Sequence, residues 1–288
     1  MAAPPVLAID VGGSKIAAAL VLGAVVQDRR ECATAREAGP EVWLADLARL
    51  VQGWSGYRVA GLAATGVIRD GLWRAVNAAT LPVPDDFAIL DALRRRLGVP
   101  VLARNDAQAA AWGEYRFGAA AGLGSVVFVT VSTGIGGGLV IDGRLVIGRA
   151  GLAGHLGITP IETDRGPRLL EDIASGSALA RLAERHGGAR DVSAAAAAGE
   201  PWAAAMMDTV VAPFALALRR LQLVLDPDAV VVGGGLGLAP GYLARLQQHL
   251  VPIPASLRPD LRAAALGADA GLIGIADLAS TEAPEFHA

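Results

Sequence analysis

The stretch LAIDVGGSKIAAAL, residues 7 to 20, sets an aspartate and a glycine pair between two apolar runs. The runs predict two strands, and Gly12–Gly13 predicts a tight turn between them. Glycines at such a turn let backbone N–H groups approach an oxyanion closely, and Lys15, the single lysine of the chain, is near enough to reach a phosphate. Because a strand follows the glycines, the stretch is neither a Walker loop nor a Rossmann turn. An ordinary hairpin capped by Asp10 is the alternative.

The composition narrows the class of protein. The chain has 288 residues, 53% of them hydrophobic, which suits two domains and a large buried core. Its formal charge of −3 provides no electrostatic footprint for nucleic acid or an anionic membrane surface. The single cysteine, Cys32, excludes an intrachain disulfide and a thiolate metal cluster. No transmembrane segment or signal peptide is recognised, so we expect a cytoplasmic protein without nucleic-acid or membrane partners.

Short apolar runs alternate with longer helical patterns along the chain. The first three runs predict an antiparallel meander, and the passage of strand, polar residue, glycine-rich turn and strand recurs at 126–141. A repeat of this length predicts two related domains rather than a solenoid. The predicted fold class is α/β, with mixed sheets and a cleft between an N-terminal domain, 1–118, and a C-terminal domain, 119–268.

Helical spacing and apolar runs predict the individual elements. In the expected helix 40–54, the core-facing residues are predicted to be Val42, Leu44, Leu47, Leu50 and Val51. A hairpin is expected to turn at Asp142–Gly143. The remaining expected elements are helices at 84–98, 106–118, 170–186, 202–225 and 240–250 and strands at 57–65, 99–106, 125–132 and 228–235.

Two further glycine-rich passages are candidates for nucleotide binding. VTVSTGIGGGLVIDG (129–143) offers the hydroxyl of Thr133 and an open backbone from Gly134 onward, an entropically costly choice for a plain hairpin. A flexible turn is the alternative. VVVGGGLG (230–237) ends a buried strand in three glycines, which leaves room for a flat ring or a phosphate. Close packing of a strand on a helix explains that passage equally well.

Polar residues elsewhere could carry chemistry. Asn105 and Asp106 stand where a strand ends and a helix begins, a placement that suits a general base facing a cleft. N-capping by the aspartate is the alternative. His155 lies among small residues, where a structural role is the alternative to ligand binding. Glu171 begins a helix, where it would also favour the helix dipole.

Taken together, these passages resemble the ROK family of sugar kinases, named for repressors, open reading frames and kinases. The resemblance implies a two-domain actin-like ATPase fold (RNase H-like), in which a C-terminal helix, 269–288, returns to the first domain. It also implies ATP and Mg²⁺ as cofactors and a homodimer. The matching segments run in order along nearly the whole chain: DVGGSKIAAAL, NDAQAAAWGE, STGIGGGLVIDG, VVVGGGLG and DAGLIGIADLA.

Within the family, the chain resembles the bacterial N-acetylmannosamine kinases. The stretches AATGVIRDG, NDAQAAAW and VTVSTGIGGG point there, and GLAGH does so most clearly. Most family members carry glutamate where this chain has His155, whereas the mannosamine kinases carry histidine. The resemblance therefore implies transfer of a phosphoryl group from ATP to the 6-hydroxyl of N-acetylmannosamine, as in sialic acid breakdown.

The resemblance also implies a role for each site residue. Asp106 would be the general base, and Asp10 would lie near Mg²⁺, through water. Sugar hydroxyls would be held by Gly66, Thr80, Asn105, Asp106, His155 and Glu171. ATP would be bound by Asp10, Gly12, Gly13, Ser14, Lys15, Thr133, Gly134, Gly233, Gly234 and Gly235. Because phosphoryl transfer needs mainly positioning and charge neutralisation, this division of roles is physically consistent.

Three departures from the family pattern stand out. A zinc-ligating histidine is replaced by Ile158, and the chain from there to Glu171 is short and has no cysteine, so we expect no structural zinc. Packing by Ile161, Leu169 and Leu170 is expected to replace the metal. A sugar-contacting asparagine of the family falls at Thr80. No helix-turn-helix precedes Asp10, which argues against the family's repressors.

Two other functions stay open from the sequence. The first is a kinase of glucose, N-acetylglucosamine or another hexose. Among these sugars, His155 argues against glucose alone. The second is a sugar-sensing protein that binds without turnover, which the missing zinc site favours. The presence of Asp106 and of both predicted phosphate turns argues against the sensor.

Overall fold

A computed structural model describes residues 3–283 except 79 and 165. Within that part the chain forms two compact units. Unit 1 comprises Met1–Phe117, Ile147–Ala153 and Ala268–Ala288, and unit 2 comprises Gly118–Val146 and Gly154–Gly267. The predicted division differs at residues 147–153, which belong to unit 1 because the buried Gln108 donates from Nε2 to the carbonyls of Gly151 and Ala153, at 3.2 and 3.0 Å.

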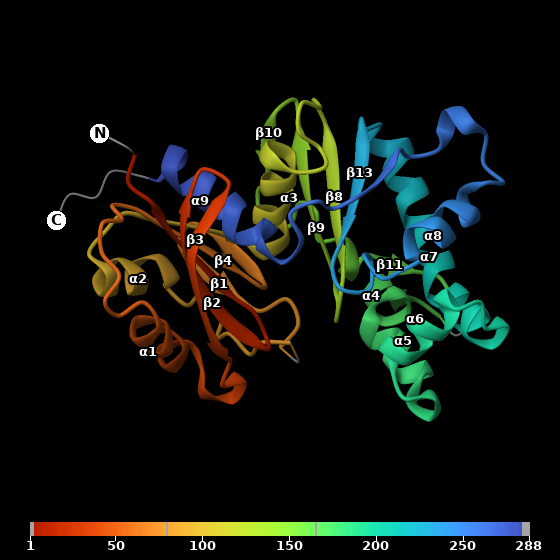
Figure 1. The fold of residues 1–288 in the computed structure, drawn as a ribbon, viewed down its shortest axis with the longest axis horizontal. Helices are drawn as coiled ribbons and strands as arrows, with labels where there is room; N and C mark the ends of the chain where they lie inside the picture. Colours follow the sequence, from red (N-terminus) through yellow and green to blue (C-terminus); the bar gives the residue numbers. More distant parts are fainter. Residues whose placement is uncertain (1–2, 79, 165, 284–288) are drawn as a thin grey trace. The chain divides into compact units, whose positions relative to one another are not determined.

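Unit 1 is built on a mixed five-stranded sheet with the order β3-β2-β1-β4-β7 (Figure 1). The first three strands pair antiparallel, which confirms the predicted meander, and β1, β4 and β7 pair parallel. The strands are β1 (Val6–Val11), β2 (Lys15–Leu22), β3 (Val25–Ala33), β4 (Ala60–Ala64) and β7 (Val101–Asn105), and a separate pair is β5 (Val67–Arg69) and β6 (Leu72–Arg74).

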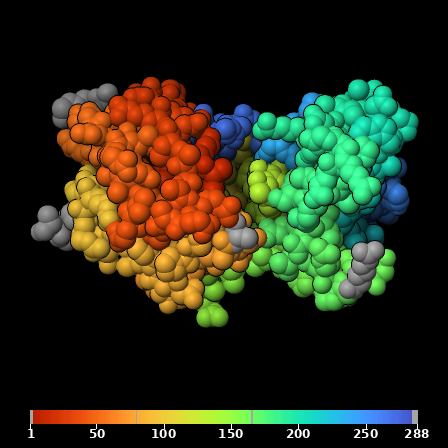
Figure 2. All heavy atoms as spheres, turned by 90° about the horizontal axis from the view of Figure 1, so that it is seen from below, coloured from red at the N-terminus to blue at the C-terminus, as the bar shows by residue number. Residues whose placement is uncertain are grey.

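The helices of unit 1 lie on both faces of this sheet. Helices α1 (Pro40–Leu50) and α2 (Ile89–Leu97) cover one face, where Leu7, Ile9 and Val11 meet Trp43 in the core. Helices α3 (Asp106–Phe117) and α9 (Ala270–Glu282) cover the other. A short 3₁₀ turn, η1 (Arg36–Ala38), precedes α1, and η5 (Gly267–Asp269) leads into α9. Figure 2 shows one side of unit 1 formed mainly by the red and orange atoms of its N-terminal segments.

Helix α9 crosses the sheet of unit 1 from one edge to the other. At its start, Arg29 on the edge strand β3 donates to Asp269 at 2.8 Å, and near its end Arg104 on β7 donates to Glu282 at 3.0 Å. It packs on small residues: a Cβ added at Gly61 of β4 would lie 2.6 Å from the carbonyl oxygen of Ile275. The observed helix, Ala270–Glu282, is shorter than the predicted returning helix 269–288. Residues 284–288 of that prediction lie outside the described residues.

Unit 2 repeats the strand arrangement of unit 1, with the order β10-β9-β8-β13-β14. Again the first three strands pair antiparallel and the rest parallel, and the hairpin turns at Asp142–Gly143 as predicted. The strands are β8 (Val126–Val131), β9 (Ile135–Ile141), β10 (Arg144–Val146), β13 (Ala229–Gly233) and β14 (Leu261–Ala263), with a small pair of β11 (Pro160–Ile161) and β12 (Arg168–Leu169).

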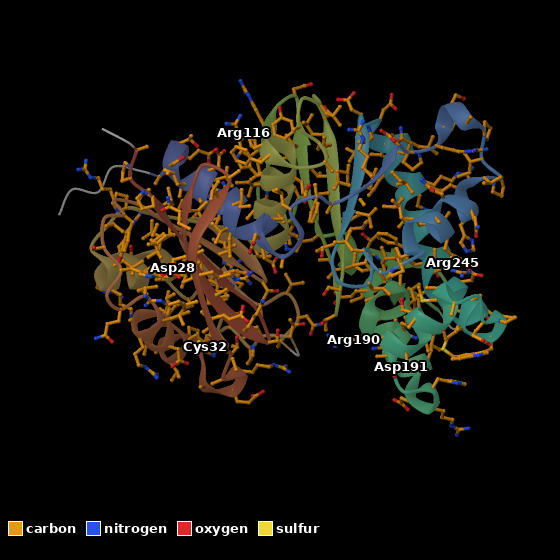
Figure 3. All side chains as sticks on the ribbon, viewed as in Figure 1. Asp28, Cys32, Arg116, Arg190, Asp191 and Arg245 are labelled. Atoms are coloured by element: carbon orange, nitrogen blue, oxygen red, sulfur yellow. The ribbon has the colours of Figure 1, made fainter. Side chains whose placement is uncertain are left out.

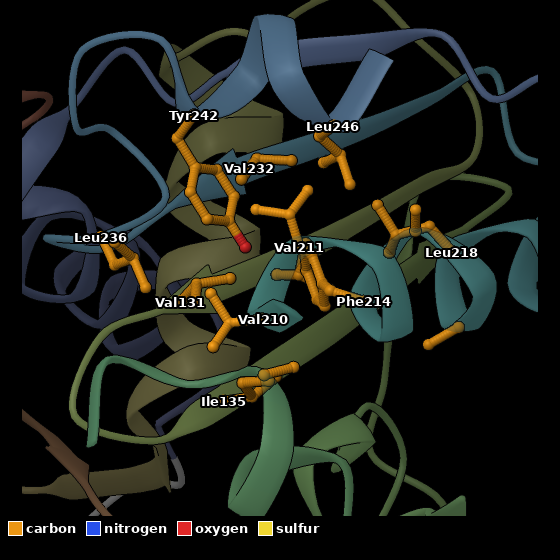
Figure 4. Close-up of a cluster of buried hydrophobic side chains, with 14 of the residues drawn as sticks. Val131, Ile135, Val210, Val211, Phe214, Leu218, Val232, Leu236, Tyr242 and Leu246 are labelled. Carbon is orange, nitrogen blue, oxygen red and sulfur yellow. The ribbon is translucent and has the colours of Figure 1, made fainter. Parts of the chain in front are cut away.

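The helices of unit 2 enclose a large apolar core. The long helix α7 contributes Val210, Val211 and Phe214, which pack with Tyr242 of α8 (Figure 4). The helices are α4 (Leu170–Ala174), α5 (Gly176–Leu182), α6 (Ala189–Ala197), α7 (Pro201–Leu225) and α8 (Tyr242–Leu250), with 3₁₀ turns η2 (Leu156–Ile158), η3 (Glu184–His186) and η4 (Ala255–Leu257). Within the described part of the chain, α7 alone has the length and apolar composition to cross a membrane, and 44% of its most apolar stretch is buried inside the protein.

Three predicted elements need correction. In α1, Val42 is exposed, and the buried face is formed by Pro40, Trp43, Leu44 and Leu47, because helical phase brings the tryptophan to the sheet. The helix expected at 84–98 begins only at Ile89, since Phe87 pairs in extended form with Trp73. The helix expected at 170–186 is two helices separated by the extended Ser175.

Candidate functional site

Asn105 and Asp106 occupy the junction between β7 and α3 in unit 1. Asn105 is the N-cap: its Oδ1 accepts hydrogen bonds from the backbone N–H groups of Ala107 and Gln108, at 3.0 and 3.1 Å. Its Nδ2 donates to the carbonyl of Gly66 at 2.9 Å. Asp106 is the first residue of the helix and is half-buried. Asp106 Oδ1 also accepts from the N–H of Ala107, at 2.8 Å, so both side chains bond the first turn of α3, with Asn105 as the N-cap.

The turn at Gly66 is fixed by its surroundings. Gly66 has φ +102, a conformation that favours glycine, and a Cβ there would collide with the carbonyl oxygen of Arg74. The indole Nε1 of Trp73 donates to the carbonyl of Thr65 at 2.8 Å. Together with the bond from Asn105, these contacts hold the turn against the end of β7.

The first glycine turn is anchored within unit 1. The N–H of Gly12 donates to the carbonyl of Lys15 at 3.0 Å, and the hydroxyl of Thr34 donates to the carbonyl of Gly12 at 2.8 Å. Thr80 lies against the turn, since a Cβ added at Gly13 would be 2.5 Å from its carbonyl oxygen. Thr80 and Gly13, predicted to serve different ligands, are thus neighbours. Ser14 is exposed beside them.

Lys15 begins β2 and pairs with Glu31 of β3. The Nζ–Oε2 distance is 3.2 Å, and both side chains are about half exposed. Such an ion pair contributes about 0–1 kcal/mol. The same Glu31 oxygen also accepts from Arg29 at 3.2 Å. Lys15 therefore has a structural partner as well as a place beside the glycine turn.

Asp10 stands near the end of β1, on the sheet face that α9 covers. Burial, and after it the negative charge of Asp106, raises the pKa of this carboxyl to about 7, while Lys15 and Arg29 act in the opposite direction. Two carboxylates close enough to repel each other form an oxygen-only site. A bound cation would therefore neutralise the negative charge of these two carboxylates.

The second glycine turn lies in unit 2, between β8 and β9. The first N–H groups of α5 hold it: Gly176 donates to the carbonyl of Ser132 at 2.7 Å, and Ser177 donates to the carbonyl of Thr133 at 3.2 Å. Thr133 is exposed and Gly134 half-buried. The turn is thus rigidly attached to a helix while its hydroxyl side chains face outward.

Glu171 lies against this second turn. A Cβ added at Gly134 would be 2.9 Å from its Oε2, and one added at Gly157 would be 3.2 Å from the same atom. Glu171 comes from the first turn of α4, and His155 directly precedes η2 two residues before Gly157. The structure therefore brings Glu171, a predicted sugar ligand, beside Gly134, a predicted phosphate ligand.

The third glycine passage follows β13 in unit 2. Gly233 packs on the ring of Phe128, where a Cβ would be 3.0 Å from two ring carbons. Gly234 has φ +85, and a Cβ there would be 2.5 Å from the Thr130 hydroxyl. Gly235 has open space beside it. Close packing thus explains the first two glycines, and only Gly235 borders a cavity.

That cavity has a volume of about 700 Å³ and lies entirely within unit 2. Its walls come from the second turn, from the passage after β13, from α5 and from α6. Its lining includes Thr133, Ser177, Arg190, Ser193, Gly235 and Leu236. The size of the cavity is in the range of small-molecule and cofactor sites.

The sequence matches the ROK family over residues 6–282. This chain belongs to the ROK family. It is 46% identical to the bifunctional enzyme NanE/NanK of Brucella melitensis over 96% of its own length, but it spans only 54% of that relative. It is 39% identical to the N-acetylmannosamine kinase of Shigella flexneri, with 96% of this chain and 99% of the relative covered.

A solved ROK structure shows the same fold. The ROK family glucokinase of Streptomyces griseus, in complex with glucose and AMPPNP, superposes with a TM-score of 0.83 at 29% identity, covering 96% of this chain and 99% of that one. The two-unit, actin-like sugar kinase fold expected from the sequence is thereby confirmed.

The family's zinc segment is replaced here by apolar packing. Ile161 and Leu170 are buried in the core of unit 2, whereas Leu169, predicted to join them, is 38% exposed because it points outward from β12. The chain has only one cysteine, Cys32, which lies in unit 1. The thiolates of the family site are therefore missing from this member.

The residues around Asp10 fit Mg²⁺, the metal that ROK kinases imply. Mg²⁺ takes one or two protein carboxylates and keeps several waters, and Asp10 with Asp106 offers such a set. Over residues 3–283, apart from 79 and 165, no group of three or more histidine, cysteine or acidic side chains converges as a denser metal site would require.

Two features of the site were not predicted. Gln108 is fully buried on α3 and ties down Gly151 and Ala153, just before the GLAGH histidine. Its place three residues after Asn105 could have signalled an inward-facing polar group. Helix α6, which forms one wall of the cavity, was also missed; Val192 is the one large apolar side chain in ARDVSAAAA.

Proposed function

We propose that this ROK member is an ATP-dependent kinase that phosphorylates the 6-hydroxyl of N-acetylmannosamine. The observation that carries the proposal is the Asn105–Asp106 junction, where Asn105 caps α3 and bonds Gly66, and the next residue is the half-buried carboxylate of Asp106. The 39% identity to a named N-acetylmannosamine kinase over almost the whole of both chains supports the choice of sugar.

In the proposed reaction, the carboxylate of Asp106 takes the proton of the sugar 6-hydroxyl. The sugar oxygen then forms a bond to the γ-phosphorus of ATP, the bond from that phosphorus to the β–γ bridging oxygen breaks, and ADP leaves. The residues proposed to hold sugar hydroxyls are Gly66, Thr80, Asn105, Asp106, His155 and Glu171. Holding the acceptor in line supplies much of the rate enhancement.

ATP is proposed to bind across the glycine turns. Gly12, Gly13, Ser14, Lys15, Thr133 and Gly134 contribute to the phosphate site, and Gly233, Gly234 and Gly235 flank adenosine in the cavity of unit 2. Asp10 would hold Mg²⁺ through water, and when bound the metal neutralises charge on the phosphates. Asp10 must then be ionised, which the nearby Lys15 and Arg29 favour.

A kinase of another hexose is the second candidate. It is favoured by the 29% identity to a glucokinase crystallised with glucose. His155, at the position where most of the family has glutamate, is the residue we propose to favour the N-acetylated sugar. We also propose that the protein is a homodimer and that it lies in the cytoplasm. Sedimentation or light scattering of the purified protein would test the dimer.

The test is release of ADP from Mg·ATP with N-acetylmannosamine, N-acetylglucosamine, glucose, mannose and fructose, and a blank without sugar. We expect the highest kcat/KM for N-acetylmannosamine. Preference for another hexose would keep the mechanism and overturn the substrate. No turnover of any sugar by folded protein would favour the non-catalytic sensor.

A further inference from the structure

Helix α6 forms one wall of the cavity in unit 2. Ala189, Arg190, Ser193 and Ala194 line the cavity, and these positions share one face of the helix by their spacing of one, three and four residues. The opposite side of α6 packs into the core through Val192. The wall is therefore held in a fixed orientation by the fold.

Ser193 carries an unsatisfied polar group in this wall. The residue is 7% exposed, and within the part of the chain that the structure describes its hydroxyl oxygen is buried without a hydrogen-bond partner. Leaving a buried hydroxyl unpaired is unfavourable, and buried polar groups are nearly always bonded. Because a serine hydroxyl can both donate and accept, and can rotate about χ1, a ligand in the cavity could satisfy it.

The cavity changes in polarity from one part to another. Ser132, Thr133, Gly176 and Ser177 lie together, as their backbone hydrogen bonds require. One turn further along α5, Ala180 continues the wall, and α6 packs beside α5. The small and apolar residues Leu238, Ala239 and Pro240 also line the cavity. Phosphate groups suit the first part, and a flat ring suits the second.

Arg190 is the one charged residue among the described residues that line the cavity. It is exposed at the start of α6, where Figure 3 labels it beside Asp191. A guanidinium plane can stack on an aromatic ring as well as pair with an anion. Its position three residues before Ser193 puts the two side chains on the same face of α6.

We propose that α6 recognises the nucleobase: the Ser193 hydroxyl hydrogen-bonds the polar edge of a purine, and Arg190 covers its face. The inference rests on the proposed function, since it takes the cavity as the nucleotide site. It adds that the base, and not only the phosphates, is held by specific side chains. A donor without a base, such as a polyphosphate, would gain nothing from either residue.

The experiment compares calorimetric affinities for ADP and for tripolyphosphate in the wild type, S193A, R190A and R190K. Ser280→Ala is the matched control, because that hydroxyl is exposed on α9, outside unit 2, and donates to the nearby Asp277 carbonyl at 2.8 Å. We expect S193A to weaken ADP binding three- to tenfold, which is the size of one hydrogen bond, and to leave tripolyphosphate unchanged. If Arg190 stacks on the base, R190K should weaken the binding of ADP nearly as much as R190A does.

The outcomes separate the possibilities. ADP affinity within twofold of wild type in S193A would overturn the role of the hydroxyl. An equal loss for ADP and tripolyphosphate would also overturn it, since the change would then act on the phosphate part. Full retention of ADP affinity by R190K, with a loss of tripolyphosphate affinity in R190A, would overturn stacking. Failure of the wild type to bind ADP would instead overturn the proposed function.

Discussion

Asn105 connects the start of α3 to the turn at Gly66 through a single side chain, with its amide donating at 2.9 Å and its carbonyl oxygen capping the helix. Asn105→Ala removes both functions, and we expect a loss of about 1–3 kcal/mol in the free energy of unfolding. Asn105→Asp retains the cap but lacks the donor, so its stability should fall between the two. Urea denaturation measures the order, and an alanine variant as stable as wild type would contradict it.

Asp106 is expected to be essential for turnover but not for folding. Asp106→Asn retains the volume and removes the base, so kcat should fall roughly 100-fold or more. The control is Asp85→Asn, an exposed aspartate of the same unit, which should keep wild-type rates. Steady-state kinetics with circular dichroism as a check on folding decides the matter. Turnover of the Asp106 variant within threefold of wild type would refute the mechanism.

Asp10 should make the stability of unit 1 depend on pH. Its pKa is about 7 in the folded protein and 3.8 in the reference state, so between these values the folded state binds more protons than the unfolded state. The free energy of unfolding therefore falls as pH rises through this range. Asp10→Asn removes this contribution, so the variant should gain stability over wild type as pH is raised from 5 to 8. If the free energies of unfolding of wild type and Asp10→Asn, measured in urea, changed in parallel from pH 5 to 8, the raised pKa of Asp10 would be contradicted.

The packing of α3 on α9 offers a matched pair of glycines. A Cβ at Gly274 would collide with the carbonyl oxygen of Ala109, whereas one at Gly271 would meet the Asp106 carbonyl oxygen at an ordinary 3.8 Å. We expect Gly274→Ala to destabilise the protein by about 1–3 kcal/mol or more. Gly271→Ala should be neutral or stabilising, since alanine favours a helix. Thermal denaturation of the two variants tests the difference, and equal melting temperatures would disprove it.

Tyr242 carries a buried hydroxyl in the core of unit 2. The residue is fully buried, burial raises the pKa of its phenol, and its oxygen has no hydrogen-bond partner among residues 3–283, with 79 and 165 left out. Removing an unpaired buried hydroxyl relieves a desolvation penalty, so Tyr242→Phe should stabilise the protein by up to about 1 kcal/mol. Phe214→Leu in the same cluster serves as a control that should destabilise. A less stable Tyr242→Phe variant would show that the hydroxyl has a favourable role.

The sequence revealed those parts of the fold that depend on local pattern. The meander, the hairpin at Asp142–Gly143 and the order of the motifs follow from turn chemistry and apolar alternation. Trp43 was missed in favour of Val42, because hydrophobicity alone does not fix the phase of a short helix. Helix α6 was missed because Val192 is its one large apolar residue.

Contacts between distant segments could not be predicted in the same way. The placement of Thr80 against Gly13 and of Glu171 against Gly134 depends on how long loops close, and local sequence carries little information on that. The same holds for the cap at Asn105: the motif indicated a cap at this junction, but only the hydrogen bonds show that Asn105 bonds the N–H groups of both Ala107 and Gln108.

The crossing of α9 over the sheet of unit 1 also bears on the order in which the chain can fold during its synthesis. The strand that carries Asp10 and the helix that begins at Asp106 leave the ribosome early, yet α9 is made after all of unit 2. Translation usually lets N-terminal domains fold first. We therefore expect the part of the nascent N-terminal sheet that α9 covers to stay exposed until residue 282 has emerged.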